Sequence, residues 1–229
     1  MALLAETDAS TFSLRALGEY LGVDPTAVYR HFDGKDDLLR EIGDQALAPA
    51  TRDFTSTVDP RDDVRRMCLG LRRTLLRNQV GLSITSLGPT RLAHELRITE
   101  VLLEALLRSG LPKEEAALVY HVFIEFTVGS AALDAPLAAK GSGRAAIYRQ
   151  WRADYQALSE LEYPAISQAH TQLYPSSEVV FVRGLDALVD QLIPVATPKK
   201  KADRATMPVR ANMPVRVSRR GSTPSAPNP

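Results

Sequence analysis

Two short helical patterns separated by a tight turn occupy residues 13–32, and this spacing constrains the fold more than any other feature of the chain. The first pattern places leucines at intervals of three and four from Leu14 to Leu21. It ends at Gly22, because glycine tolerates the left-handed conformation that closes a helix. The second begins at Pro25, whose ring fits the first helical position. Two helices that meet across so short a turn predict a helix-turn-helix, whose second helix enters the major groove of DNA.

The stretch FSLRALGEYLGVDPTAVYRHFDGKDDLL resembles the DNA-binding segment of the tetracycline-repressor (TetR) family, and the resemblance covers residues 12–47. The residues in register with the family pattern are Arg15, Gly22, Val23, Tyr29, His31, Phe32, Lys35 and Leu38. Gly18 departs from it, because the family usually has alanine there. The resemblance implies an all-α protein with an N-terminal helix-turn-helix three-helix domain and a larger C-terminal helical domain for regulation and dimerisation. We therefore expect domains at 1–48 and 60–195. The many prolines and few large apolar residues of 197–229 predict a disordered basic tail after them.

The same resemblance implies which residues of the unit Ser13 to Phe32 and its flank approach DNA. Expected at base edges are the side chains of Arg15 and Thr26 and the backbone of Pro25 and Ala27. Expected at phosphates are Tyr29, Arg30, His31 and Lys35. For Tyr29 the alternative is that its ring only packs against the domain.

The head of the chain is acidic, which is unusual for a DNA-binding domain. Residues 1–50 hold four basic and nine acidic residues, a net charge of −5. Because neutralisation of phosphates supplies much of the affinity for DNA, the few basic residues must gather on one face for the domain to bind. The acidic head keeps one alternative open, a helical partner-binding or structural protein without sequence-specific DNA binding.

From residue 60 onward the sequence consists of successive helical patterns, and no useful stretch alternates with the period of a strand. The predicted helices cover 60–79, 92–110, 112–135 and 176–193. Their ends carry the usual signals, such as a proline at Pro60 and a glycine at Gly110. The all-α class is therefore predicted by these patterns as well as by the resemblance.

Residues 116–133 are apolar almost throughout and approach the length of a membrane span. His121 and Glu125 in the middle, and flanks without a clear charge bias, favour a buried helix that packs both inside its subunit and against a partner. A second helix of this kind, at 176–193, contains Gly184, which permits close approach. Together with their copies, the two helices predict a four-helix interface in a homodimer, as the TetR resemblance also implies. The expected interface residues are Val128, Val182, Leu185 and Val189.

The TetR resemblance further implies an apolar cavity for a small-molecule effector in the larger domain. The expected apolar lining is Met67, Leu71, Leu75, Tyr120, Phe123, Trp151 and Tyr155. The expected polar contacts are Asn78, His121 and Glu125. Two alternatives remain open. Aromatic residues at helical spacing also suit an ordinary core, and His121 and Glu125, one turn apart, can form a hydrogen-bonded pair of buried groups.

Other functions lack the residues that they need. The sequence has no paired Glu-x-x-His motifs for a di-metal bundle, no phosphate-binding loop, no dinucleotide glycine motif and no nucleophile elbow. We therefore expect no enzymatic activity, catalytic residue, metal or cofactor. The lone Cys68, expected to pack in the core, and a start without a signal-peptide pattern indicate a cytoplasmic protein outside the membrane.

The two ends of the chain carry separate expectations. Only ten residues precede Thr11, too few for the first helix of a TetR-like domain, so we expect the natural protein to begin roughly a dozen residues upstream with added positive charge. The alternative is a genuine short form with a weakened DNA-binding head. The tail at 197–229 has eight basic residues and one acidic residue, a net charge of +7. It is either a solvated tail or an aid to non-specific DNA attraction.

These features together predict a ligand-responsive transcriptional regulator. The expected partners are a palindromic operator in double-stranded DNA, a small-molecule effector and a second copy of the chain. In this interpretation the protein is a repressor that leaves its operator when the effector changes the spacing of the two recognition helices.

Overall fold

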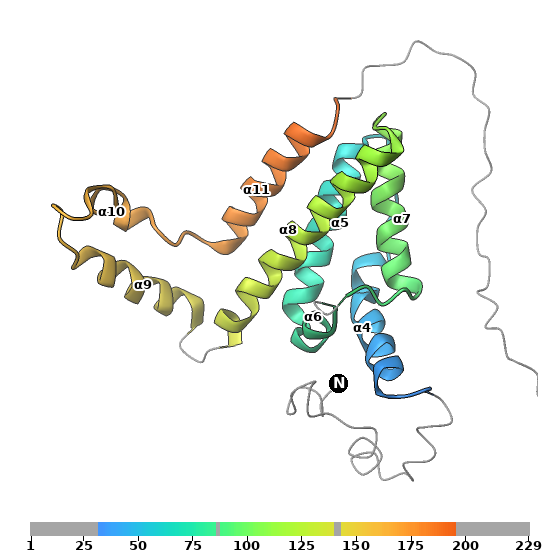
Figure 1. Cartoon of the computed structure of the whole chain (residues 1–229), viewed down its shortest axis with the longest axis horizontal. Helices are drawn as coiled ribbons and strands as arrows, with labels where there is room; N and C mark the ends of the chain where they lie inside the picture. The colour runs from blue at the N-terminus through green and yellow to red at the C-terminus, as the bar shows by residue number, and fades with distance from the viewer. Residues whose placement is uncertain (1–31, 86–87, 140–142, 196–229) are drawn as a thin grey trace, which may run out of the picture. The chain divides into compact units, whose positions relative to one another are not determined.

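The computed structural model describes residues 32–85, 88–139 and 143–195, and it contains helices but no strand in these ranges (Figure 1). The elements are α4 (Lys35–Thr51), α5 (Pro60–Arg77), α6 (Gln79–Thr85), α7 (Ala93–Arg108), α8 (Lys113–Ala139), α9 (Gly143–Gln156), α10 (Pro164–Ala169), the 3-10 helix η1 (His170–Gln172) and α11 (Ser177–Leu192). The prediction of an all-α fold is confirmed over this part of the chain. Both ends of the chain, with the expectations made for them, lie outside the described residues.

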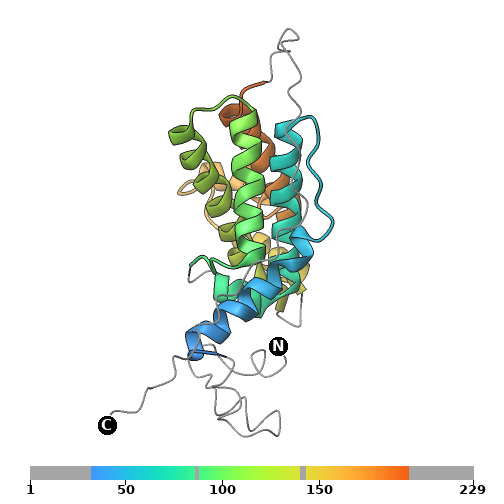
Figure 2. The ribbon, with the colours of Figure 1, turned by 90° about the vertical axis from the view of Figure 1, so that its right-hand side faces the viewer.

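Helix α5 forms the centre of the bundle, where it packs against α4, α7, α8 and α11 (Figures 1 and 2). Asp59 caps its start by accepting a hydrogen bond from the backbone N–H of Arg61 at 2.9 Å, and Pro60 fits the first turn. Its buried stripe includes Cys68, and burial raises the pKa of this thiol to about 12. The thiol therefore stays protonated and packs in the core, as the sequence predicted.

Helix α4 continues from the predicted DNA-binding segment into the bundle. It begins at Lys35 and ends at Thr51, beyond the expected domain boundary at 48, and it packs on α5, α6 and α7. The contact with α6 is close, because a Cβ atom added at Gly81 would lie 2.3 Å from the Cβ of Ala46. The sequence patterns did not predict α6, since its seven residues are too few for a periodic signal.

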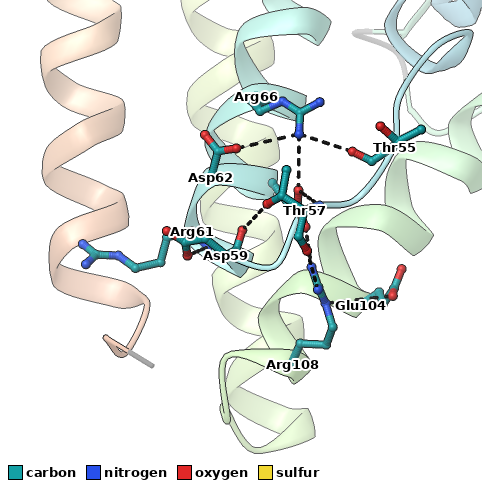
Figure 3. Close-up of polar contacts among 9 residues, drawn as sticks. Thr55, Thr57, Asp59, Arg61, Asp62, Arg66, Glu104 and Arg108 are labelled. Atoms are coloured by element: carbon teal, nitrogen blue, oxygen red, sulfur yellow. Dashed lines mark hydrogen bonds and ion pairs between the residues drawn. The ribbon is translucent and has the colours of Figure 1, made fainter. Parts of the chain in front are cut away.

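A polar network fixes the connection between α4 and α5 at one end of the bundle (Figure 3). At its centre lies the fully buried Asp63, whose carboxylate accepts a hydrogen bond from the backbone N–H of Thr57 at 2.7 Å and pairs with Arg108 of α7. Arg66 lies 3.6 Å from the same carboxylate and donates to the carbonyl of Thr55 at 3.2 Å. Two arginines therefore compensate this buried charge, as burial of a carboxylate requires.

Helix α8 has the length and apolar composition of a membrane span over Lys113–Leu137, yet it packs against α5, α7 and α11. Core helices of soluble proteins meet the same criterion, so composition alone does not indicate a membrane. The predicted close approach at Gly184 is confirmed, because a Cβ atom there would lie 2.6 Å from Cζ of Phe126. The outer face of α8 still exposes large apolar side chains, with Leu118 at 60% and Leu133 at 78%.

Helices α9 and α10 and η1 contact one another, and α9 also contacts α8. Four aromatic rings gather in this region, those of Tyr148, Trp151, Tyr155 and Tyr174. The hydroxyl of Tyr174 donates to that of Tyr155 at 3.0 Å. The aromatic residues therefore pack mainly with one another, outside both the cavity and the main core that was the alternative expectation for them.

Candidate functional site

A cavity of about 500 Å³ lies among α4, α5, α6, α7, α8 and the segment that leads into α7. Its apolar side chains are Leu47, Leu71, Leu75, Pro89, Ile98, Ile124 and Val128. Its polar side chains are Thr85, Thr90, Glu95, Thr99, Tyr120, His121 and Glu125. A largely apolar cavity with a few polar groups is typical of a site for a small molecule.

Half of the predicted lining residues lie in this cavity: Leu71, Leu75, Tyr120, His121 and Glu125. The side chains of His121 and Glu125 are exposed, so they are not the pair of buried polar groups that was the alternative interpretation. Their exposure places them on the open side of the cavity, while Tyr120 is half-buried in its wall.

The structure places the other five predicted lining residues elsewhere. Met67 and Phe123 are fully buried in the core, because they lie on the helix faces that turn toward the centre of the bundle. The side chain of Asn78 accepts a hydrogen bond from the backbone N–H of Gly81 at 2.9 Å, where α5 gives way to α6. The last two, Trp151 and Tyr155, belong to the aromatic group around α9.

A chain of hydrogen bonds crosses the cavity wall from α8 to α7. The hydroxyl of Thr99 donates to the carboxylate of Glu95 at 2.7 Å and lies 2.8 Å from the hydroxyl of Tyr120. Because Thr99 has one hydroxyl proton, Tyr120 must donate in the second bond. Burial raises the pKa of Tyr120, and the negative charge of Glu95 also raises it, so this hydroxyl stays protonated. The other oxygen of Glu95 accepts from the backbone N–H of Arg91 at 3.1 Å.

The buried Asp44 connects α4 to the start of α7, and no sequence pattern indicated this residue. Its carboxylate accepts from the hydroxyl of Thr90 at 3.0 Å and from the backbone N–H groups of His94 at 3.1 Å and Glu95 at 2.9 Å. A carboxylate in this position satisfies the free N–H groups of a helix start and is favoured by the helix dipole. Nearby, the hydroxyl of Thr51 lies 3.0 Å from Nδ1 of His94. Helix α4 is therefore bound directly to the turn that carries Glu95.

Only one of the four predicted dimer-interface residues, Val182, lies next to an exposed apolar side chain of α11, that of Val179. Leu185 and Val189 are buried in the core of their own subunit, Val128 lines the cavity, and Val182 is half-buried beside a different groove. The physical reason is that the most regular apolar stripe of a helix is the one its own subunit buries. The apolar side chains left exposed on these two helices include Leu118, Leu133, Val179 and Val180.

Of the predicted DNA contacts, Lys35 lies in the described part of the chain, as the first residue of α4. Phe32, the last residue of the predicted helix-turn-helix, lies three residues before it. The remaining predictions fall outside the described residues: Ser13, Arg15, Pro25, Thr26, Ala27, Tyr29, Arg30 and His31.

Comparison with known families agrees with the helical domain described above and with the predicted DNA-binding segment. The family profile described as Tetracyclin repressor-like, C-terminal domain, matches residues 56–192, which include the described lining residues of the cavity except Leu47 of α4. The profile described as Bacterial regulatory proteins, tetR family, matches residues 1–42. The chain belongs to the TetR family. TetR-family proteins are DNA-binding transcriptional regulators that act as dimers and respond to small molecules.

Individual relatives support the same family. An HTH-type transcriptional repressor of Mycobacterium tuberculosis is 28% identical over 198 residues, which are 82% of this chain and 75% of that protein. ActR from Streptomyces coelicolor, solved in complex with actinorhodin, has a TM-score of 0.72 and 20% identity, over 83% of this chain and 91% of that one. SCO7222, a TetR from the same organism, has a TM-score of 0.70 and 22% identity, over 83% and 92%. At such identities the solved structures show the shared fold alone.

Proposed function

We propose that this TetR-family chain is a cytoplasmic repressor that binds a palindromic operator as a homodimer and releases it when a small molecule fills the cavity beside Glu95. In this proposal the protein acts by binding DNA and a small molecule, and it catalyses no reaction. The observation that carries the proposal is the position of the cavity, because its wall includes α4, the helix that continues from the predicted DNA-binding segment. The repressor relative supports the direction of control, and ActR shows that a protein of this fold holds a small molecule.

The contacts of Asp44 give the cavity a route to the DNA-binding head. A molecule that contacts Glu95 or the adjoining turn bears on the start of α7, and Asp44 bonds that start to α4. On the other side of α4, Gly81 of α6 leaves almost no free space against Ala46. A change in the position of α7 therefore shifts α4. An effector that fits one position of α7 better than the other then has different affinities for the DNA-bound and the released state.

A gel shift with DNA fragments from upstream of its own gene tests the proposed function. We expect a sequence-dependent shift that weakens as salt rises, because binding releases counterions from phosphates. Arg15→Ala should relax the sequence preference, whereas Lys35→Ala should weaken binding to all sequences alike and flatten the salt dependence. Lys113→Ala, at the exposed start of α8, is the matched control and should bind as the parent does. A shift that is identical for every DNA fragment would contradict the proposal.

We place the dimer interface on the outer face of α8 and α11. The exposed apolar side chains there include Leu118, Leu133 and Val180, and a charge in the buried centre of an interface is costly. Leu133→Glu should therefore produce monomers in sedimentation while each subunit stays folded. Leu107→Glu is the control, because this leucine is about half exposed on α7, a helix that is not part of the proposed interface. Dimers that persist in Leu133→Glu and in Leu118→Glu would contradict this placement.

A further inference from the structure

The hydroxyl protons of the described lining residues of the cavity are all used inside the protein. Thr99 donates to Glu95, and Tyr120 donates to Thr99. Thr90 donates to Asp44 at 3.0 Å, and the hydroxyl of Thr85 bonds to backbone carbonyls of its own helix, the nearer at 2.9 Å. Each of these hydroxyl groups therefore has only oxygen lone pairs left for a bound molecule.

The charged side chains of the cavity wall are also hydrogen-bond acceptors. Among its described lining residues, the acidic side chains are Glu95 and Glu125, and no lysine or arginine is present. Neither glutamate forms an ion pair with a described residue. His121, on the exposed side, is the one described lining side chain with an N–H to give. The wall thus offers negative charge and hydrogen-bond acceptors.

The start of α7 would ordinarily attract an anion, because free backbone N–H groups and the helix dipole meet there. In this chain Asp44 occupies that position and takes the N–H groups of His94 and Glu95. The N–H of Leu92 lies 3.4 Å from the hydroxyl oxygen of Thr90, and that of Arg91 donates to Glu95. The helix start beside the cavity therefore already has a carboxylate of the protein on two of its N–H groups, which makes it a poor site for an anionic ligand.

We propose that the effector is an apolar amine that binds as a cation, with its N–H groups donated to Glu95 and to the lone pairs of Tyr120. The proposal rests on the proposed function, since it names the class of molecule that the regulatory cavity takes. The aliphatic lining, which includes Leu71, Ile98 and Ile124, accepts the apolar body. Glu125, on the open side, attracts the cation at entry. A cavity of about 500 Å³ is large enough for a molecule of three fused rings.

Three probes with one apolar body and different charges test this class. At neutral pH 9-aminoacridine is a cation with N–H donors, acridine is neutral, and acridine-9-carboxylate is an anion. Each is titrated by fluorescence into the purified full chain without DNA, because acridines also bind DNA. We expect 9-aminoacridine to bind at least about tenfold more tightly than acridine, as one charge-assisted hydrogen bond provides. The carboxylate should bind more weakly than both.

Two variants locate the binding. Glu95→Gln keeps an acceptor for Thr99 but removes the charge. It should therefore lower the affinity for 9-aminoacridine by about tenfold and leave the affinity for acridine within about twofold of the parent's. Glu100→Gln is the matched control, because Glu100 is exposed on the same helix and does not line the cavity. This control should leave the affinity for both probes unchanged. A thermal melt of each variant shows that the fold is intact.

The outcomes separate this inference from the proposed function. Tighter binding of the carboxylate, equal binding of the three probes, or no loss in Glu95→Gln would each overturn the amine class, whatever the gel shifts show. A preference for the cation that depends on Glu95 supports the class even if no DNA fragment is shifted in a sequence-dependent way. In that last case the repressor function fails and the amine-binding site stands.

Discussion

The buried carboxylate of the core and the carboxylate of the cavity wall have different partners in this regulator. In the core, Asp134 is buried between Arg72 and Arg144, and Arg72 also donates to Ser130 at 3.0 Å. Burial lowers the pKa of Arg72, and the charge of Asp134 opposes this effect. In the cavity, Glu95 receives hydrogen bonds but no ion pair from a described residue. The chain therefore supplies arginine where the carboxylate of Asp134 is buried in the core, and no described residue pairs with Glu95 in the cavity where we propose that the effector binds.

This difference follows from the cost of burying a charge. A buried carboxylate without a partner destabilises the folded state, so a core position retains one only with a cation and hydrogen bonds around it. A cavity wall is hydrated when it is empty, so a glutamate there keeps its charge at a smaller cost. That charge is then available to a ligand that displaces the water. Asp44 is intermediate, because a helix start and a hydroxyl compensate it in place of an arginine.

The largest effect is expected from breaking the core pair. Asp134→Ala leaves Arg72 buried beside Arg144 without its paired carboxylate, and loss of one partner of a buried pair costs about 3–5 kcal/mol. Urea unfolding followed by circular dichroism measures this loss. Asp190→Ala is the control, since Asp190 is 67% exposed and its pairing with Arg61 should matter little to stability. Similar losses in the two variants would mean that burial does not distinguish these pairs.

A smaller effect is expected at the joint between α4 and α7. Asp44→Ala removes one acceptor from two backbone N–H groups and from Thr90, and a lost helix cap typically costs about 0.5–2 kcal/mol. Asp44→Asn keeps an oxygen acceptor and should recover part of that stability. Because Asp44 connects the cavity to α4, the alanine variant should also lose most of the change in operator affinity that an effector causes. A variant that remains fully responsive would show that the coupling runs through other contacts.

The sequence predicted this architecture more completely than it predicted the site. Long helices such as α5 and α11 carry strong periodic patterns and capping residues, so their ends were predicted to within about two residues. Which face of a helix meets which neighbour depends on tertiary packing, and this is why Leu185 was assigned to the dimer interface although it lies in the core. Asp44 gave no local signal, because its partners at Thr90 and beyond lie far along the chain. Glu95 was missed for a related reason, since a glutamate in the first turn of a helix suggests only a favourable charge at a helix start.

The smallest effect on stability is expected at the cavity, where the comparison with the core is most direct. Glu95→Gln keeps an oxygen for Thr99 and removes a negative charge that no described residue pairs with, so the free energy of unfolding should change by less than about 1 kcal/mol. Urea unfolding of Glu95→Gln and of Asp134→Ala under the same conditions compares what the two carboxylates contribute to the free energy of unfolding. If Glu95→Gln destabilises as strongly as Asp134→Ala, then Glu95 holds α7 in place as a core residue does. Its charge would then serve the fold, and the difference between core and cavity would be lost.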